Sequence, residues 1–138
     1  MKASTHTLSK LFAILSLLPL PALAEDSNKP APPAVLPGVN ADPHIAVFGK
    51  TFYLYPTTDG SEGWMATSFH GWSSKDLVNW KDEGVILDLP KDLKWADVRA
   101  WAPAIAGKDG KFYYYYSAGQ SIGVAVSDKP MGPFKDPL

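Results

Sequence analysis

The chain has 138 residues, 46% of them hydrophobic, and a formal net charge of −1, which is the composition of a globular protein. Because its 13 basic and 14 acidic side chains nearly balance, the charge does not favour nucleic acid or an anionic membrane as a partner. The sequence contains no cysteine, so disulfides are excluded and the fold must depend on its hydrophobic core.

The first 24 residues have the parts of a secretory signal peptide. Lys2 and Lys10 flank a polar start, residues 11–20 form an apolar run, and residues 22–24 supply small side chains for a peptidase. The alternative is a membrane anchor, but a spanning helix needs roughly 20 apolar residues, about twice the length of this run. The sequence therefore predicts cleavage before Glu25 and a secreted or periplasmic protein.

A Pro-rich leader is predicted over residues 25–36, ahead of a domain over residues 37–138. The prolines in this part of the chain are Pro30, Pro32, Pro33 and Pro37. Each one removes a backbone donor and restricts φ. The segment should therefore be extended and lie outside the hydrophobic core.

From Asp42 onward, short runs of aromatic and β-branched residues alternate with Gly, Asp, Ser and Pro, which is typical of strands and turns. No window of helical length has a sustained 3.6-residue apolar period. The chain also repeats itself, because residues 43–57 align without a gap with residues 103–117, at an offset of 60. Both copies have the pattern of a strand, a tight turn with glycine and a second strand, so a β-hairpin should open each repeat.

The second halves of the repeats also correspond. Residues 64–68 and 121–126 are each predicted to form a third strand. Residues 74–82 parallel residues 127–136, and both segments end with an aromatic residue followed by Lys-Asp. Three or four antiparallel strands per repeat are the make-up of a β-propeller blade. A single β-sandwich is the alternative, but it would not require a repeat in register.

The predicted fold is therefore all-β, with about two blades of a β-propeller. Propellers close on themselves with about four to eight blades, and this sequence has room for two. Two blades leave open sheet edges and unburied faces, which favour aggregation. We therefore expect the sequence to be the N-terminal part of a longer protein.

The repeat provides an internal control for Asp42. The residue before the strand-opening proline is Asp42 in the first repeat and Ala102 in the second, so the scaffold does not require a carboxylate there. A following proline biases its predecessor toward extended geometry, which should hold the Asp42 side chain in few directions. The inner strands of a propeller line its central channel, where sites gather. Asp42 is therefore a candidate functional residue.

Four ordered motifs stand out in the repeats. They are Asn-Ala-Asp-Pro at 40–43, Phe-Tyr-Leu-Tyr at 52–55, Ser-Lys-Asp-Leu-Val-Asn-Trp at 74–80, and Trp-Ala-Pro-Ala-Ile at 101–105 followed by Gly-Lys-Phe-Tyr-Tyr-Tyr at 110–115. Together they resemble glycoside hydrolase family 43, over about residue 36 to the end. The resemblance implies a five-bladed β-propeller that cleaves arabinose- or xylose-containing plant polysaccharides, with inversion of the anomeric carbon by three carboxyl groups.

The resemblance gives Asp42 the role of the general base, which activates water against the anomeric carbon. An inverting site needs a base and an acid roughly 6.5–9.5 Å apart, in surroundings that keep one ionised and the other protonated. In the family, the acid is a Glu and its pKa is tuned by an Asp, both on later blades, and no position here matches them. This chain alone is therefore expected to be inactive.

Trp101, Trp64 and Arg99 are the candidate substrate-binding residues. A flat aromatic ring can pack on a sugar face, and a planar guanidinium suits sugar hydroxyls. The alternative for both tryptophans, and for Trp95, is packing in the core or at its rim. The alternative for Arg99 is a surface ion pair. A rival function uses the three tryptophans as stacking platforms of a non-catalytic carbohydrate-binding β-protein.

No cofactor is expected, and whether the channel holds an ion stays open. His44 could orient or ligate a group near the channel, but a single histidine without a second ligand at metal spacing favours a structural role. Asp59, Asp97 and His70 are predicted in loops, and Asp136 in a turn. The expected partner is an oligo- or polysaccharide substrate, and neither nucleic acid nor a membrane is expected.

Overall fold

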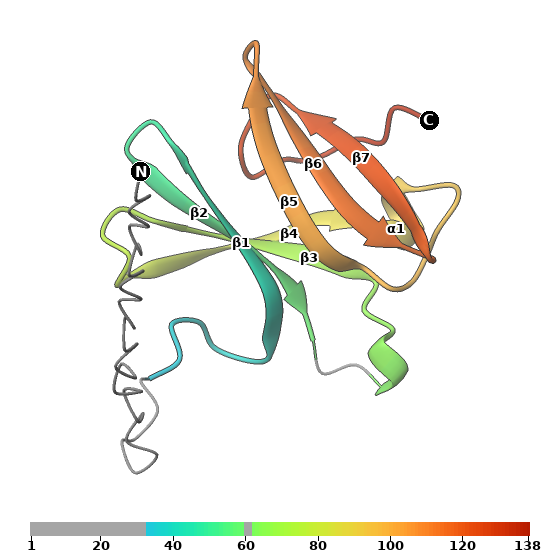
Figure 1. Ribbon diagram of the computed structural model, residues 1–138, viewed down its shortest axis with the longest axis horizontal. Helices are drawn as coiled ribbons and strands as arrows, with labels where there is room; N and C mark the ends of the chain where they lie inside the picture. The colour runs from blue at the N-terminus through green and yellow to red at the C-terminus, as the bar shows by residue number, and fades with distance from the viewer. Residues whose placement is uncertain (1–32, 60–61) are drawn as a thin grey trace, which may run out of the picture. The chain divides into compact units, whose positions relative to one another are not determined.

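Seven strands in two antiparallel sheets make up the part of the chain that the computed structural model describes, residues 33–59 and 62–138 (Figure 1). The predicted signal peptide and the predicted leader up to residue 32 lie outside the described residues. The first sheet contains β1 Asn40–Phe48, β2 Thr51–Thr58, β3 Ser68–Ser74 and β4 Trp80–Asp88, in that order. The second contains β5 Trp101–Lys108, β6 Lys111–Ala118 and β7 Ser121–Ser127. The all-β prediction is confirmed.

The sequence repeat is also a repeat of structure. Every residue pair between β5 and β6 is a pair between β1 and β2 shifted by 60 positions, for instance Ile105–Tyr114 and Ile45–Leu54. Both hairpins are joined by two-residue turns, as the glycines there predict. The hairpin that should open each repeat is therefore present, in the predicted register.

The second sheet contains only a trace of a fourth strand. After β7 the chain turns back, and Lys135 forms a single bridge with Val126 of β7. The equivalent pair in the first sheet is Ser73 of β3 with Lys81 of β4. The parallel between residues 74–82 and 127–136 therefore holds in space, although only the first sheet extends it into a full outer strand.

The predicted third strand at residues 64–68 is wrong. Trp64 ends a short 3-10 helix, η1 Glu62–Trp64, residues 65–67 form no helix or strand, and β3 begins only at Ser68. The carbonyl of Ala66 accepts a hydrogen bond from the Ala100 N–H at 2.9 Å, so this segment pairs with the connection between the sheets and not with a neighbouring strand. The prediction that His70 lies in a loop is also wrong, because this residue lies within β3.

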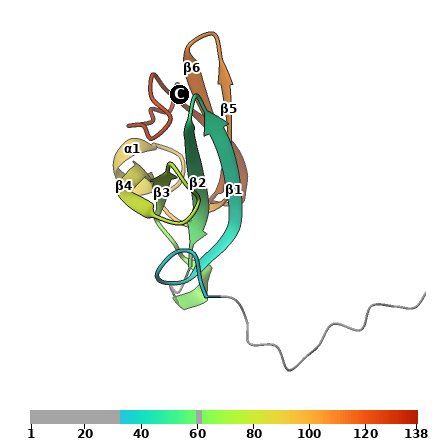
Figure 2. The same cartoon turned by 90° about the vertical axis from the view of Figure 1, so that its left-hand side faces the viewer.

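The hydrophobic core lies between the two sheets, where β5 packs against β1 and β2 (Figure 2). β6 contains five consecutive aromatic residues, yet only alternate residues such as Tyr114 and Tyr116 are buried, as a two-residue strand period requires. The ring of Tyr114 lies 5.4 Å from that of Phe69 in β3 and 4.9 Å from that of Phe134, centroid to centroid. The two sheets therefore share one core.

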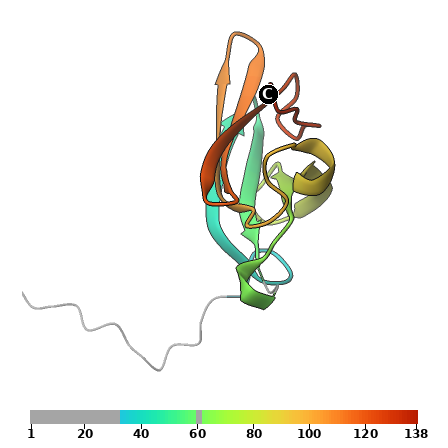
Figure 3. The ribbon, with the colours of Figure 1, turned by 90° about the vertical axis from the view of Figure 1, so that its right-hand side faces the viewer.

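The connection between the sheets, residues 89–100, begins with the single helical turn α1 Leu89–Asp92 (Figure 3). Leu89 and Leu93 are buried in the core and hold this turn against the first sheet. The N–H of Leu89 also donates to the carbonyl of Thr67 at 2.9 Å. Within the described residues, no helix is long and apolar enough to cross a membrane.

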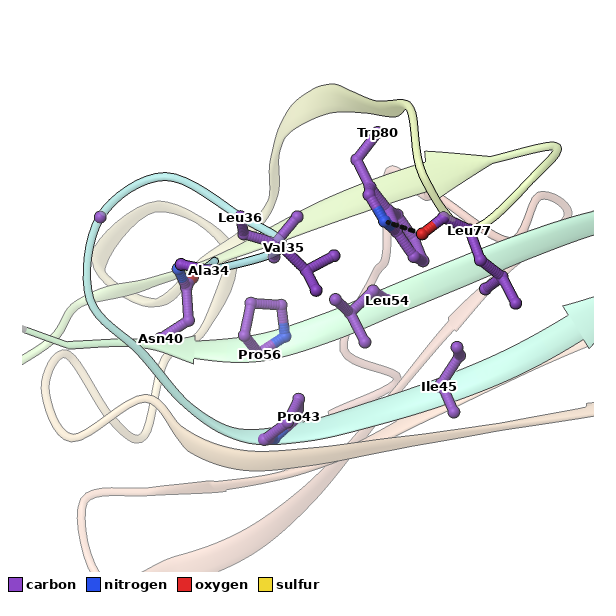
Figure 4. A pocket seen from close by; sticks show the side chains of 11 residues that line it. Ala34, Val35, Leu36, Asn40, Pro43, Ile45, Leu54, Pro56, Leu77 and Trp80 are labelled. Atoms are coloured by element: carbon purple, nitrogen blue, oxygen red, sulfur yellow. Dashed lines mark hydrogen bonds between the residues drawn. The ribbon is translucent and has the colours of Figure 1, made fainter. Parts of the chain in front are cut away.

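An apolar groove of about 450 Å³ lies on the first sheet (Figure 4). Its floor contains Ile45 of β1 and Leu54 of β2, and Trp80 lies at one end. Val35 and Leu36, from the end of the predicted leader, lie over the strands, and Leu36 is buried. The last leader residues thus pack on the sheet.

Candidate active site

Asp42 stands in a β-bulge at the start of the first inner strand. The pairing of β1 with β2 shifts register between Ala41 and His44, and Asp42 has a φ of 45°. The prediction of extended geometry before the proline is therefore wrong. Ala102 stands in the equivalent bulge of β5 with a φ of 44°, so the bend comes from the bulge itself and not from the carboxylate.

The two bulges meet at one open pocket of about 290 Å³. Its lining comes from both sheets and from the segment after β2. The lining residues are Asp42, Thr57, Asp59, Trp64, Trp101, Ala102 and Ser117. Three of the four predicted site residues, Asp42, Trp64 and Trp101, are thus brought together by the fold, from positions far apart in the sequence.

The aromatic wall of the pocket is held by defined contacts. The indole Nε1 of Trp101 donates a hydrogen bond to the carbonyl of Trp64 at 2.9 Å. The guanidinium carbon of Arg99 lies over the Trp101 ring, 5.9 Å from its centroid, which is within the range of a cation–π contact. Arg99 takes part in no ion pair among the residues that the structure describes. Trp64 is 67% exposed, so the core alternative for this side chain does not apply.

Left-handed backbone is concentrated around this pocket. In the described ranges, seven non-glycine residues have a positive φ, and four of them are Asp42, Trp64, Arg99 and Ala102. The others lie in turns, where such geometry is ordinary. A non-glycine residue in this region costs on the order of 1–3 kcal/mol, and such residues cluster at functional sites. The residues with left-handed backbone thus lie around the same pocket as the predicted site side chains.

A buried hydroxyl joins the two bulges. Thr57 of β2 is 1% exposed, and its Oγ1 accepts a hydrogen bond from the N–H of Ala102 at 2.8 Å. The same hydroxyl donates to Oδ2 of Asp42 at 3.3 Å. The carboxylate is therefore held from inside the fold, while its residue remains exposed toward the pocket.

Four pocket residues were not among the predicted site residues: Thr57, Asp59, Ala102 and Ser117. Asp59 does lie in a loop, as predicted, and it lines the same pocket as Asp42. Thr57 and Ser117 differ by the repeat offset of 60, so the alignment that exposed Asp42 and Ala102 could also have drawn attention to this hydroxyl pair.

Trp95 lies away from this pocket. Its ring is stacked on Tyr116 at a centroid distance of 6.2 Å, and its Nε1 donates to Oδ2 of Asp136 at 2.5 Å. Asp136 also accepts the N–H of Leu138 at 2.9 Å, in keeping with a turn. Burial, and then the Asp136 carboxylate, raise the pKa of Tyr116. The structure therefore favours the packing alternative for Trp95.

The remaining candidates do not join the pocket. His44 is half-buried in β1 and pairs with Tyr55, and Asp97 lies in the connection between the sheets. Over residues 33–59 and 62–138, no group of three His, Cys, Asp or Glu side chains is placed to hold a metal ion.

Two repeated sheets around one core, with a carboxylate and two tryptophans where the inner strands begin, define a partial β-propeller. The chain belongs to the family described as glycosyl hydrolases family 43, whose sequence model matches residues 32–138. The family's enzymes are five-bladed propellers, and the two sheets correspond to two of those blades.

Several relatives are xylosidases or arabinosidases by name. A xylosidase/arabinosidase of Bacteroides ovatus is 37% identical, over 68% of this chain and 34% of its own length. A β-xylosidase/α-arabinofuranosidase from a compost metagenome, solved with xylotriose in a calcium-free form, is 39% identical with a TM-score of 0.65 over 70% of this chain and 34% of its own. An α-L-arabinofuranosidase of Clostridium thermocellum is 42% identical with a TM-score of 0.62, over 71% and 34%. This chain spans about a third of the length of these relatives.

Proposed function

We propose that this chain supplies the first two blades of an exported, inverting glycoside hydrolase that acts on arabinose- or xylose-containing polysaccharides. The observation that carries the proposal is the position of Asp42, a carboxylate beside Trp64 and Trp101 in the pocket where the inner strands begin. Relatives named as xylosidases and arabinosidases support the substrate class.

Asp42 acts in this proposal as the general base. Its carboxylate takes a proton from a water molecule, which attacks the anomeric carbon from the side opposite the leaving oxygen, so the configuration inverts. The leaving oxygen needs a proton from a second carboxyl group, at a separation of roughly 6.5–9.5 Å from the base. The acid comes from a later blade, so the chain alone has little or no activity.

The pocket wall binds the sugar. Arg99 covers one face of the Trp101 ring, which leaves the other face for a sugar ring. The hydrogen bond from Trp101 to the carbonyl of Trp64 fixes the orientation of that face. The acid–base chemistry of this proposal uses only carboxyl groups and water.

Export follows from the N-terminal sequence. Residues 1–24 have the pattern of a signal peptide, which directs the protein to the periplasm or the medium, where polysaccharide is found. N-terminal sequencing of the exported protein should begin at Glu25, and an uncleaved Met1 would contradict the assignment.

Hydrolysis is tested in a hybrid enzyme with a complete propeller. In it, residues 33–138 of this chain replace the matched segment of the Bacteroides ovatus relative. Asp42→Asn should lower kcat on p-nitrophenyl xyloside or arabinofuranoside by about 10²- to 10⁴-fold, the usual contribution of a general base. Binding of xylotriose, measured by calorimetry, should be largely kept, because the substitution removes a charge and leaves the aromatic wall.

The control is Asp97→Asn, which removes a carboxylate from the connecting loop, outside the pocket. It should leave both kcat and binding unchanged. If Asp42→Asn keeps the parental rate, the catalytic proposal fails. An Asp42→Asn variant that keeps both the parental rate and xylotriose binding would favour the non-catalytic carbohydrate-binding alternative.

A further inference from the structure

The hydroxyl group of Thr57 contacts both the proposed base, Asp42, and Ala102 of the second sheet. It lies near the end of β2, between the bulge that carries Asp42 and the bulge that carries Ala102. Its exposed fraction is 1%, so water does not compete for its hydroxyl group. A β-branched side chain also has few χ1 options, which limits the positions of Oγ1.

The hydrogen bond from Ala102 sets the direction of the Thr57 proton. A bulge leaves a backbone N–H without its regular partner in the sheet, and the N–H of Ala102 donates instead to Oγ1 of Thr57 at 2.8 Å. A hydroxyl has one proton and two lone pairs. With one lone pair used by Ala102, the proton remains free to point to Asp42, whose Oδ2 lies at 3.3 Å.

An ionised carboxylate only accepts hydrogen bonds, so this contact orients the Asp42 side chain in its basic form. One Asp42 oxygen is thus held by Thr57. The other is left for water. A general base must lie within hydrogen-bond reach of the proton that it takes, so a carboxylate that rotates freely would be correctly placed for only part of the time.

We propose that Thr57 is a positioning residue that couples the joint between the first two blades to the orientation of Asp42. This inference rests on the proposed role of Asp42 as the general base. Ser117, the equivalent of Thr57 in the second repeat, also lines the pocket but has no carboxylate at the neighbouring bulge. The coupling therefore exists only where the repeat carries Asp42.

Thr57→Val tests this inference, because it keeps the β-branched shape and removes the hydroxyl. In the hybrid enzyme, kcat should fall by about 10- to 100-fold, the effect of losing one hydrogen bond to a charged group, while KM changes little. Thr57→Ser keeps a hydroxyl at the same position and should restore most of kcat. Loss of kcat in Thr57→Val without recovery in Thr57→Ser would overturn the inference.

Thr58→Val is the matched control. Thr58 is the next residue of the same strand, and its buried Oγ1 has no hydrogen-bond partner among the described residues. Its replacement removes a hydroxyl of the same kind without breaking a contact, so kcat should not change. An equal loss of kcat in Thr57→Val and Thr58→Val would show a general effect on the strand and would overturn the inference.

A second measurement follows the hydrogen bond without catalysis. In the full chain, amide hydrogen exchange read by NMR should show the Ala102 N–H protected in the parent and in Thr58→Val, and exchanging at least about tenfold faster in Thr57→Val. An Ala102 amide equally protected in Thr57→Val would overturn the coupling. Asp42→Asn separates the two proposals. An inactive Asp42→Asn variant beside a fully active Thr57→Val variant would reject only the positioning role of Thr57. A fully active Asp42→Asn variant would reject the role of Asp42 as the base.

Discussion

Two tyrosines of the core differ in whether their hydroxyl groups have a partner. Tyr55 and Tyr114 are both fully buried, and their rings lie 5.7 Å apart, centroid to centroid. The hydroxyl of Tyr55 donates to the carbonyl of Pro130 at 2.8 Å. The hydroxyl of Tyr114 has no partner in the described part of the chain. Similar burial thus accompanies opposite hydrogen-bond status.

The two corresponding phenylalanine substitutions should change stability in opposite directions. Tyr114→Phe removes a buried hydroxyl that has no partner, and should stabilise the chain by about 1 kcal/mol. Tyr55→Phe removes a satisfied hydroxyl and leaves the Pro130 carbonyl unpaired, which should cost about 1 kcal/mol. Urea unfolding of the full chain measures both. A loss of stability in Tyr114→Phe equal to that in Tyr55→Phe would show that Tyr114 has a partner after all.

The sequence predicted Asp42 as a site residue but did not point to Thr57, whose hydroxyl contacts its carboxylate. Asp42 was recognisable because the repeat offers Ala102 for comparison, and Trp64 and Trp101 because aromatic rings suit sugars. Thr57 was not, since its importance depends on two hydrogen bonds, one to Asp42 in the same sheet and one from Ala102 in the other sheet. Contacts of this kind depend on the packing of distant segments, which no local pattern encodes.

The turn between β3 and β4 is built around one carboxylate. Asp76 accepts hydrogen bonds from the N–H groups of Val78 and Asn79 and from the Asn79 side-chain amide, at 2.8–2.9 Å. The bond from the Asn79 N–H, then that from the Asn79 side chain, then that from Val78 hold the pKa of Asp76 well below its usual range. The turn is therefore stabilised by the ionised form.

Asp76→Ala should lower the Tm of the chain in a way that depends on pH. Because the pKa of Asp76 is lower in the folded state than in the unfolded state, its contribution is complete above the ordinary aspartate pKa and declines as pH falls below it. The gap in Tm between parent and variant should thus be largest at neutral pH and narrow between about pH 4 and 2. Melts followed by circular dichroism measure it. A gap that is the same at every pH would contradict this account.

Strand boundaries were harder to predict than the repeat itself. The hairpins of both repeats follow from alternation and glycine turns, which are local features. Residues 64–68 have an apolar composition that suits a strand, but Ala66 pairs with Ala100, beyond β4 and α1. The composition of a segment does not show which backbone it will meet.

At the scale of the whole molecule, the repeat allows the burial of equivalent faces of the two sheets to be compared. Ile105 and Tyr114 face the first sheet, and they are 7% and 0% exposed. Their equivalents Ile45 and Leu54 line the apolar groove of the first sheet, where Ile45 is 52% exposed. The face that one blade buries against its neighbour is thus open on the other. This chain spans about a third of its relatives' length, and in a complete propeller another blade would cover this face.

The complete propeller is also where the central claim, that Asp42 is the base of an inverting hydrolase, is tested most directly. The measurement is azide rescue of Asp42→Ala in the hybrid enzyme, with the product followed by proton NMR. Azide attacks without losing a proton, so it needs no base, while the acid of the later blades still protonates the leaving oxygen. The account predicts a slow variant whose rate azide restores, with a glycosyl azide of inverted configuration. A variant that hydrolyses at the parental rate, or one that azide does not restore, would contradict it.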